Sequence, residues 1–106
     1  FEKELVDSNF SIDPDPNTAQ LDFDKLRFPI TIRKPIRGDY FYPLGLGGKK
    51  LLSDFFTDKK LSSVEKENTW LLVSGGNIVW VIGLRIDERF KVSLQTKNVF
   101  KIHTGL

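Results

Sequence analysis

Two apolar stretches separated by a short glycine turn place the strongest constraint on the fold. Thr69–Ser74 and Ile78–Ile82 flank the sequence Gly-Gly-Asn at residues 75–77. Glycines supply the positive φ angles that a tight hairpin turn needs, so this segment predicts a β-hairpin. Both arms are almost continuously apolar, which is typical of strands covered on both faces. We expect Trp70 and Trp80 to form a cross-strand pair in the core.

Alternating apolar patterns predict further strands around this hairpin. In residues 28–34 we expect Phe28, Ile30 and Ile32 to point inward, and Pro35 to end the strand because proline cannot donate to a sheet ladder. The expected strands are 18–26, 28–34, 84–92 and 98–103, with a short extended segment at 40–43.

Two helices are expected between these strands. Residues 49–60 carry an apolar stripe (Leu51, Leu52, Phe55 and Phe56) at helical spacing. Residues 62–67 form a second, short helix, because Ser62 and the glutamate three positions later have capping-box spacing. Strands interrupted by few helices predict an α+β fold with sandwich-like sheets.

The length and charge distribution define what kind of chain this is. At 106 residues it corresponds to one domain, it has no cysteine, and no apolar run reaches the length of a membrane span. Residues 1–24 hold seven of the fourteen acidic residues and one of the sixteen basic residues. A basic body with an acidic leader favours a polyanionic partner, although a merely solvated surface is the alternative. We expect residues 1–17 to be an irregular leader or linker, residues 18–106 to be the domain, and the chain to be a fragment of a longer protein.

The motifs of several enzyme classes are incomplete. Ser74-Gly-Gly-Asn begins like a pyrophosphatase loop but continues with Ile and Val, so a hairpin turn explains it better. Residues 43–50 lack the spacing of a Walker loop. His103 is the only histidine, which makes a zinc site unexpected and a solvent-facing position the default. Asp87 and Glu88 are expected to form ion pairs with the flanking arginines, and no catalytic residue or metal ligand is predicted.

A glycine-rich turn followed by Lys49 and Lys50 is the best candidate for a binding site. The amides and dipole at a helix N-terminus, together with two ammonium groups, would suit a phosphate. Residues 33–60 contain seven basic and three acidic residues, which favours RNA or DNA binding. The aromatic residues 40–42 either stack on exposed bases or belong to the core.

The order of several motifs resembles one known family. Arg-Lys at 33–34, Arg-Gly-Asp-Tyr-Phe-Tyr-Pro-Leu-Gly at 37–45, Lys-Lys at 49–50, Ser-Asp-Phe-Phe-Thr-Asp-Lys-Lys at 53–60 and Arg-Ile-Asp-Glu-Arg-Phe-Lys-Val at 85–92 follow one another in the chain. Over residues 25–95 this order is similar to the C-terminal domain of tRNA(Ile)-lysidine synthase, most closely to the Bacteroidetes branch.

The resemblance implies an accessory tRNA-binding domain, related in fold to a domain of the phenylalanyl-tRNA synthetase β subunit. The full enzyme of that family uses ATP, and with it Mg²⁺, to join lysine to the wobble cytidine of isoleucine tRNA in the cytoplasm. That chemistry belongs to an N-terminal catalytic domain absent from this chain, so no cofactor is expected here. The matching turn positions are Gly38, Asp39, Pro43, Gly45 and Gly48, and the candidate tRNA-binding residues are Arg33, Lys34, Arg37, Lys49, Lys50, Lys59, Lys60, Arg85 and Arg89.

The chain departs from the family pattern in three places. Leu-Ser-Ser at 61–63 stands where many members carry proline and arginine, so no RNA contact is expected there. Trp70 stands where a proline often precedes the hairpin, and Leu51 intervenes between the lysine pair and the Leu-Ser-Asp that follows. The alternative function is a docking module that packs its apolar hairpin on another domain or on a second subunit, as in a homodimer.

Overall fold

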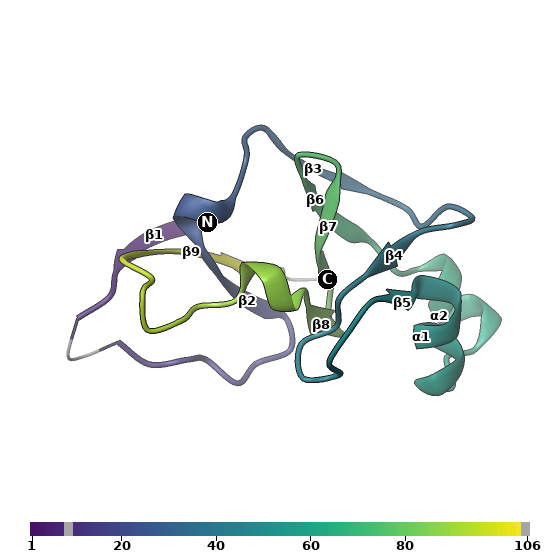
Figure 1. Ribbon diagram of the computed structural model, residues 1–106. Coiled ribbons are helices and arrows are strands. Elements are labelled where there is room, and N and C mark those ends of the chain that lie inside the picture. Colours follow the sequence, from purple (N-terminus) through teal and green to yellow (C-terminus); the bar gives the residue numbers. More distant parts are fainter. Residues whose placement is uncertain (8–9, 105–106) are drawn as a thin grey trace.

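Two stacked β-sheets form the body of the domain, and a small β-hairpin with a helix covers the outer face of the larger sheet (Figure 1). The computed structural model describes residues 1–7 and 10–104. The three sheets have the strand orders β1-β9-β2, β3-β6-β7-β8 and β4-β5. This arrangement confirms a strand-rich α+β domain with few helices.

The chain passes from the smaller sheet to the larger one, through the β4–β5 hairpin, and back through the larger sheet to the smaller sheet. The strands are β1 (Glu2–Leu5), β2 (Thr18–Asp22), β3 (Ile30–Arg33), β4 (Tyr40–Phe41), β5 (Lys50–Leu51), β6 (Leu71–Ser74), β7 (Asn77–Val81), β8 (Arg85–Ile86) and β9 (Asn98–His103). The helices are α1 (Leu52–Asp58) and α2 (Ser63–Glu67), and two 3-10 turns are η1 (Phe23–Lys25) and η2 (Glu88–Phe90). No helix among the described residues is long and apolar enough to cross a membrane.

The predicted hairpin is the centre of the larger sheet. Strands β6 and β7 pair around Gly75 and Gly76, whose φ angles are 55° and 81°. Every residue of β6 is buried, and β7 is buried after its first residue, so the prediction of a doubly covered sheet is confirmed. The tryptophan pair is wrong: Trp80 lies opposite Leu72, whereas Trp70 precedes β6 and is 37% exposed.

The two faces of the larger sheet pack into separate cores. Leu72, Val79 and Trp80 pack against residues of β2 and β9, among them Leu21 and Phe100, between the two stacked sheets. On the opposite face, side chains of the hairpin pack under β4 and α1. The residues of this second core are Phe41, Leu52, Phe55, Phe56, Leu71, Val73, Ile78 and Val81. The second core therefore fixes the position of the β4–β5 hairpin, on which the candidate site lies.

Three expected strands differ from the observed ones. In the expected strand 28–34 the predicted inward face is wrong for Phe28 and Ile32, which are 51% and 57% exposed, whereas Ile30 packs against the core between the stacked sheets. Among the described strands β3 pairs with β6 alone, so it lies at the edge of its sheet. Strand β2 ends at Asp22, whose side chain accepts a hydrogen bond from the Asp24 amide and begins η1. The segment 84–92 is mostly not a strand, because Asp87 begins η2 in the same way.

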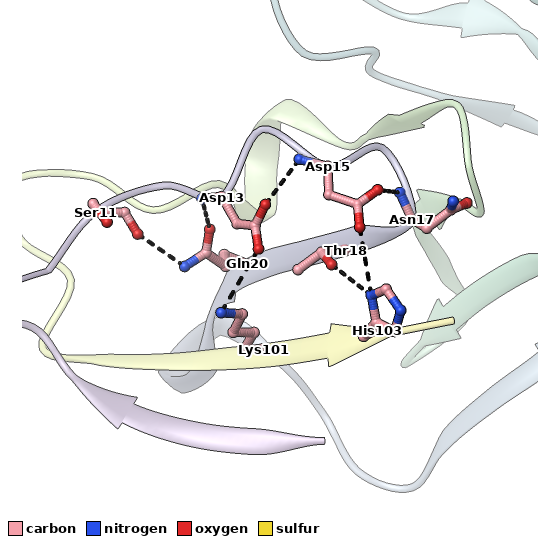
Figure 2. Close-up of polar contacts among 8 residues, drawn as sticks. All are labelled: Ser11, Asp13, Asp15, Asn17, Thr18, Gln20, Lys101 and His103. Carbon is pink, nitrogen blue, oxygen red and sulfur yellow. Dashed lines mark hydrogen bonds and ion pairs between the residues drawn. The ribbon is translucent and has the colours of Figure 1, made fainter. Parts of the chain in front are cut away.

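The acidic leader is not irregular throughout. Residues 2–5 form β1, which pairs with β9 and adds a strand to the smaller sheet. Residues 11–17 then run alongside β2 and β9 (Figure 2). The Asp13 amide donates to the Gln20 side chain (2.6 Å), and the Asp15 carboxylate lies 3.7 Å from Nδ1 of His103. The expectation of irregular structure is therefore wrong at residues 2–5, while the boundary between leader and domain stays a prediction.

Candidate nucleic-acid interface

Lys50 lies on a strand and Lys49 directly before it, so neither lysine is in a helix. Lys50 and Leu51 form β5, which pairs with β4, and α1 begins only at Leu52. The amide of Leu52 donates to the carbonyl of Asp39 (2.9 Å), so the chain itself caps one of the first free amides. The prediction of a helix over 49–60 is confirmed for Leu52–Asp58 and wrong at its start. The lysine pair is therefore not at a helix N-terminus, so that argument for a phosphate site is wrong. Leu51 is exposed and does not belong to the apolar stripe.

A shallow hollow gathers four of the nine predicted basic residues. It has a volume of about 470 Å³ and lies between the glycine-rich loop that precedes β5, the exposed side of α1 and the start of β8. Its lining residues are Leu46, Gly48, Lys49, Lys50, Phe55, Asp58, Lys59 and Arg85. Lys49 and Lys59 are exposed, so their ammonium groups can reach a ligand in the solvent. We call this site the basic hollow.

One acidic residue reduces the charge of the basic hollow. Asp58, at the end of α1, forms an ion pair with Lys50 of β5. The Asp58 side chain is 61% exposed and the Lys50 side chain 29% exposed. The hollow therefore carries four cationic groups and one carboxylate, and an anion bound there would compete with Asp58 for Lys50.

Aromatic rings hold one cation of the hollow and one predicted cation outside it. The Lys49 ammonium lies 4.0 Å from the centroid of the Tyr40 ring, and the Arg89 guanidinium lies 4.3 Å from that of Tyr42. The two tyrosine rings contact each other edge to face, with centroids 6.4 Å apart. Cation–π contacts of this kind restrict a flexible side chain. Of the three aromatic residues at 40–42, Phe41 is core, and Tyr40 is 41% exposed.

Arg33 acts within the domain. Its guanidinium donates two hydrogen bonds of 2.9 Å to the Asp39 carboxylate, which also accepts the amide of Ile36 (2.8 Å). Burial by itself would raise the pKa of Asp39, but the hydrogen bonds from Arg33 and Ile36 outweigh burial and lower it below its usual range. This ion pair closes the turn around Gly38 that leads into β4, so Arg33 has a structural role within the domain.

Arg89 is held in a comparable way. Its guanidinium donates to the carboxylate of the fully buried Asp87, and these hydrogen bonds raise the pKa of Arg89. This confirms the expected arginine ion pair for Asp87, with Arg89 and not Arg85 as its partner, whereas Glu88 pairs with Lys91 and not with an arginine. Arg85 lies instead at the hollow, its guanidinium 5.7 Å from the Phe55 ring centroid.

The other predicted basic residues lie outside the hollow. The Lys34 ammonium donates to the carbonyl of Glu67 and lies 4.4 Å from the Trp70 ring centroid. Arg37 is exposed in the turn before β4, and Lys60 is exposed just after α1. The nine predicted residues therefore do not form one surface, and their role in tRNA binding stays a prediction.

Two residues that shape the hollow were missed by the sequence reasoning. Asp58 was counted only as a charge, although its position at the end of α1 places it against the lysine pair. Glu88 accepts a hydrogen bond from the Gly45 amide (3.2 Å) and so ties the glycine-rich loop to η2. Neither contact has a sequence signal, because the partners are eight and forty-three residues apart.

The architecture and the site define a class of protein: a small strand-rich α+β domain with a basic hollow on its surface. The described residues contain no cluster of histidine, cysteine and acidic side chains that could hold a metal ion. The profile of the family described as TilS substrate C-terminal domain matches residues 30–103. The chain belongs to this family, as its resemblance predicted.

Curated relatives and solved structures agree with this assignment. The chain is 48% identical over 103 residues to tRNA(Ile)-lysidine synthase of Parabacteroides distasonis, covering 97% of this chain and 24% of that protein. It is 45% identical over 91 residues to the synthase of Bacteroides thetaiotaomicron, covering 86% of this chain and 21% of that protein. The predicted Bacteroidetes branch is thus confirmed, and the chain spans about a quarter of the length of these relatives.

The fold has two informative structural neighbours. The crystal structure of the TilS C-terminal domain superposes with a TM-score of 0.77 at 20% identity, covering 95% of this chain and 78% of that chain. An N-terminal fragment of the phenylalanyl-tRNA synthetase β subunit from Pyrococcus horikoshii superposes with a TM-score of 0.68 at 25% identity, covering 79% of this chain and 26% of that chain. Both confirm the expected fold relationship.

Proposed function

We propose that this chain is the tRNA-binding domain of a tRNA(Ile)-lysidine synthase and that it binds the RNA backbone at the basic hollow. The observation that carries the proposal is the convergence of Lys49, Lys50, Lys59 and Arg85 on one depression from three separate segments of the chain. The relatives are named tRNA(Ile)-lysidine synthases, which indicates RNA as the ligand, and the hollow offers a place where phosphates can bind.

The chemistry of the hollow fits an RNA backbone better than a base edge. Its cationic groups suit phosphates, which provide most of the salt-sensitive affinity for nucleic acids. Double-stranded RNA has a narrow major groove and is bound largely by shape and backbone contacts. A shallow hollow lined by lysines and an arginine meets that requirement, and the acceptor stem of the tRNA is the double-stranded region that we assign to it.

The domain would position the tRNA and would contribute no chemical group to the reaction. Binding the tRNA body reduces the entropic cost of bringing the wobble cytidine to a distant catalytic site. In this proposal the ligase reaction, with its ATP and Mg²⁺, takes place in the remaining three quarters of the enzyme, in the cytoplasm. Isoleucine tRNA and the catalytic domain are therefore the two partners of this chain.

A salt series with an isoleucine-tRNA transcript tests the proposal. Four phosphate contacts predict a loss of affinity of roughly 100-fold between 50 and 200 mM salt. The double variant Lys49→Glu/Lys50→Glu should weaken binding at least tenfold and reduce the slope of log K against log salt by about 2. Lys25→Glu/Lys97→Glu is the matched control, because it makes the same change in net charge at exposed lysines outside the hollow. Equal effects of the two variants would contradict a defined site.

One observation favours the alternative of a docking module. An apolar groove of about 500 Å³ opens between the stacked sheets and is lined mainly by Ile32, Trp70, Ile82 and Ile102. The occupant we assign to it under this alternative is the rest of the same polypeptide, since the relatives are about four times longer than this chain. Association through this groove would be insensitive to salt and abolished by Ile32→Asp, while Lys49→Glu/Lys50→Glu would leave it unchanged.

A further inference from the structure

Gly48 is a glycine for which the domain itself gives no reason. A side chain at Gly48 would meet no atom within 4 Å, and its φ angle lies outside the left-handed region. The other glycines of the loop, Gly45 and Gly47, have φ angles of 83° and 75° and so have a conformational reason to be glycine. Glycine is also entropically unfavourable compared with alanine, so a position that tolerates alanine has something to gain from it.

The backbone next to Gly48 has free donors. No hydrogen bond joins the amides of Gly47 and Gly48 to another described residue, whereas the Leu44, Gly45 and Leu46 amides all have acceptors. Successive amides in a turn form a concavity that binds anions. Gly48 and Lys49 both line the basic hollow, and Gly47 directly precedes them in the same loop.

We propose that the loop 46–49 is the point of closest approach between this domain and the RNA backbone. The amides of Gly47 and Gly48 donate to a phosphate oxygen, and the ammonium groups of Lys49 and Lys59 balance its charge. The absence of a side chain at Gly48 lets the phosphate and its ribose reach the loop backbone. This inference rests on the proposed function, because it places one RNA phosphate within the basic hollow.

The proposal predicts opposite effects of two glycine substitutions. Gly48→Ala should weaken binding of the tRNA transcript about tenfold while the melting temperature stays equal or rises, because alanine restricts the unfolded chain. The slope of log K against log salt should be the same for Gly48→Ala as for the unchanged chain, because every cation remains. Gly76→Ala is the control outside the basic hollow: it should lower the melting temperature through its positive φ of 81° and leave the affinity of the folded chain unchanged.

A second readout follows the amides directly. In ¹H–¹⁵N NMR spectra of the chain titrated with a short RNA duplex of acceptor-stem sequence, the Gly47 and Gly48 resonances should be among those that shift most. Gly48→Ala with unchanged affinity, together with unshifted glycine amides, would overturn this inference. If Lys49→Glu/Lys50→Glu still weakens binding in that case, the proposed function stands without it. If neither variant matters, the basic hollow itself is not the RNA site.

Discussion

The carboxylate of Asp87 accepts two hydrogen bonds of 3.0 Å from the guanidinium of Arg89, two residues further along the chain. The same carboxylate accepts the backbone amides of Arg89 (2.8 Å) and Tyr42 (2.9 Å). Asp87 is fully buried, so these four donors replace its water shell. The pair thereby joins η2 to the segment after β4, and it turns the exposed side of Arg89 toward the Tyr42 ring.

Replacing the buried carboxylate should therefore be costly. Asp87→Asn should lower the free energy of unfolding by about 3 kcal/mol, because the Arg89 guanidinium loses its ionic partner and some donors lose their acceptor. Urea denaturation followed by tryptophan fluorescence measures the change. Asp58→Asn breaks an exposed ion pair and should cost less than about 1 kcal/mol. Equal losses for the two variants would show that Asp87 does not hold the two segments together.

The Arg33–Asp39 pair should make the free energy of unfolding depend on pH in the acidic range. The pKa of Asp39 is lower in the folded chain than its ordinary value, so the unfolded chain binds a proton more readily. The stabilisation is complete above the unfolded pKa of about 3.9 and is lost as the pH falls through the folded value. Asp39→Asn should lower the free energy of unfolding by about 2 kcal/mol at pH 7. In urea titrations the difference between the two proteins should shrink below pH 4, and a constant difference would contradict this account.

The sequence predicted those parts of the fold that local patterns determine. The hairpin around Gly75 and Gly76 and the capping box of Ser62 with Glu65 are found as expected, because each depends on residues a few positions apart. The stripe of Leu52, Phe55 and Phe56 is buried for the same reason. Such signals do not depend on where the rest of the chain lies.

The incorrect predictions involve contacts between distant segments. Lys50 has good helix propensity, yet the chain before Leu52 pairs with β4 as a strand. Ile32 alternates like a buried residue, but it lies on an edge strand that nothing covers. The candidate site was likewise predicted as a collection of basic residues. Only the folded chain separates Arg33 and Arg89, which bond to acidic residues, from the four cations that line the hollow.

The end of α1 contains a residue in an unfavourable conformation. The amides of Lys60 and Leu61 donate to the carbonyls of Thr57 and Phe56, which is the pattern of a Schellman motif. Lys60 occupies its left-handed position with a φ angle of 57°, where glycine is usual. Lys60→Gly should therefore raise the free energy of unfolding by about 1 kcal/mol. Lys60→Ala removes the same charge and keeps the side-chain penalty, so it should give no gain; thermal and urea denaturation compare the two.

The ion pair between Asp58 and Lys50 should limit the affinity of the hollow for RNA. Because an anion has to compete with Asp58 for Lys50, Asp58→Asn should tighten binding of the tRNA transcript about fivefold, equivalent to ~1 kcal/mol for one charge at short range in water. The gain should fade as salt rises, since the charges in the hollow are partly exposed. Asp54→Asn is the matched control, an exposed acidic residue of α1 that does not line the hollow. Unchanged or weaker binding by Asp58→Asn, measured by fluorescence anisotropy at two salt concentrations, would show that Lys50 does not contact phosphate.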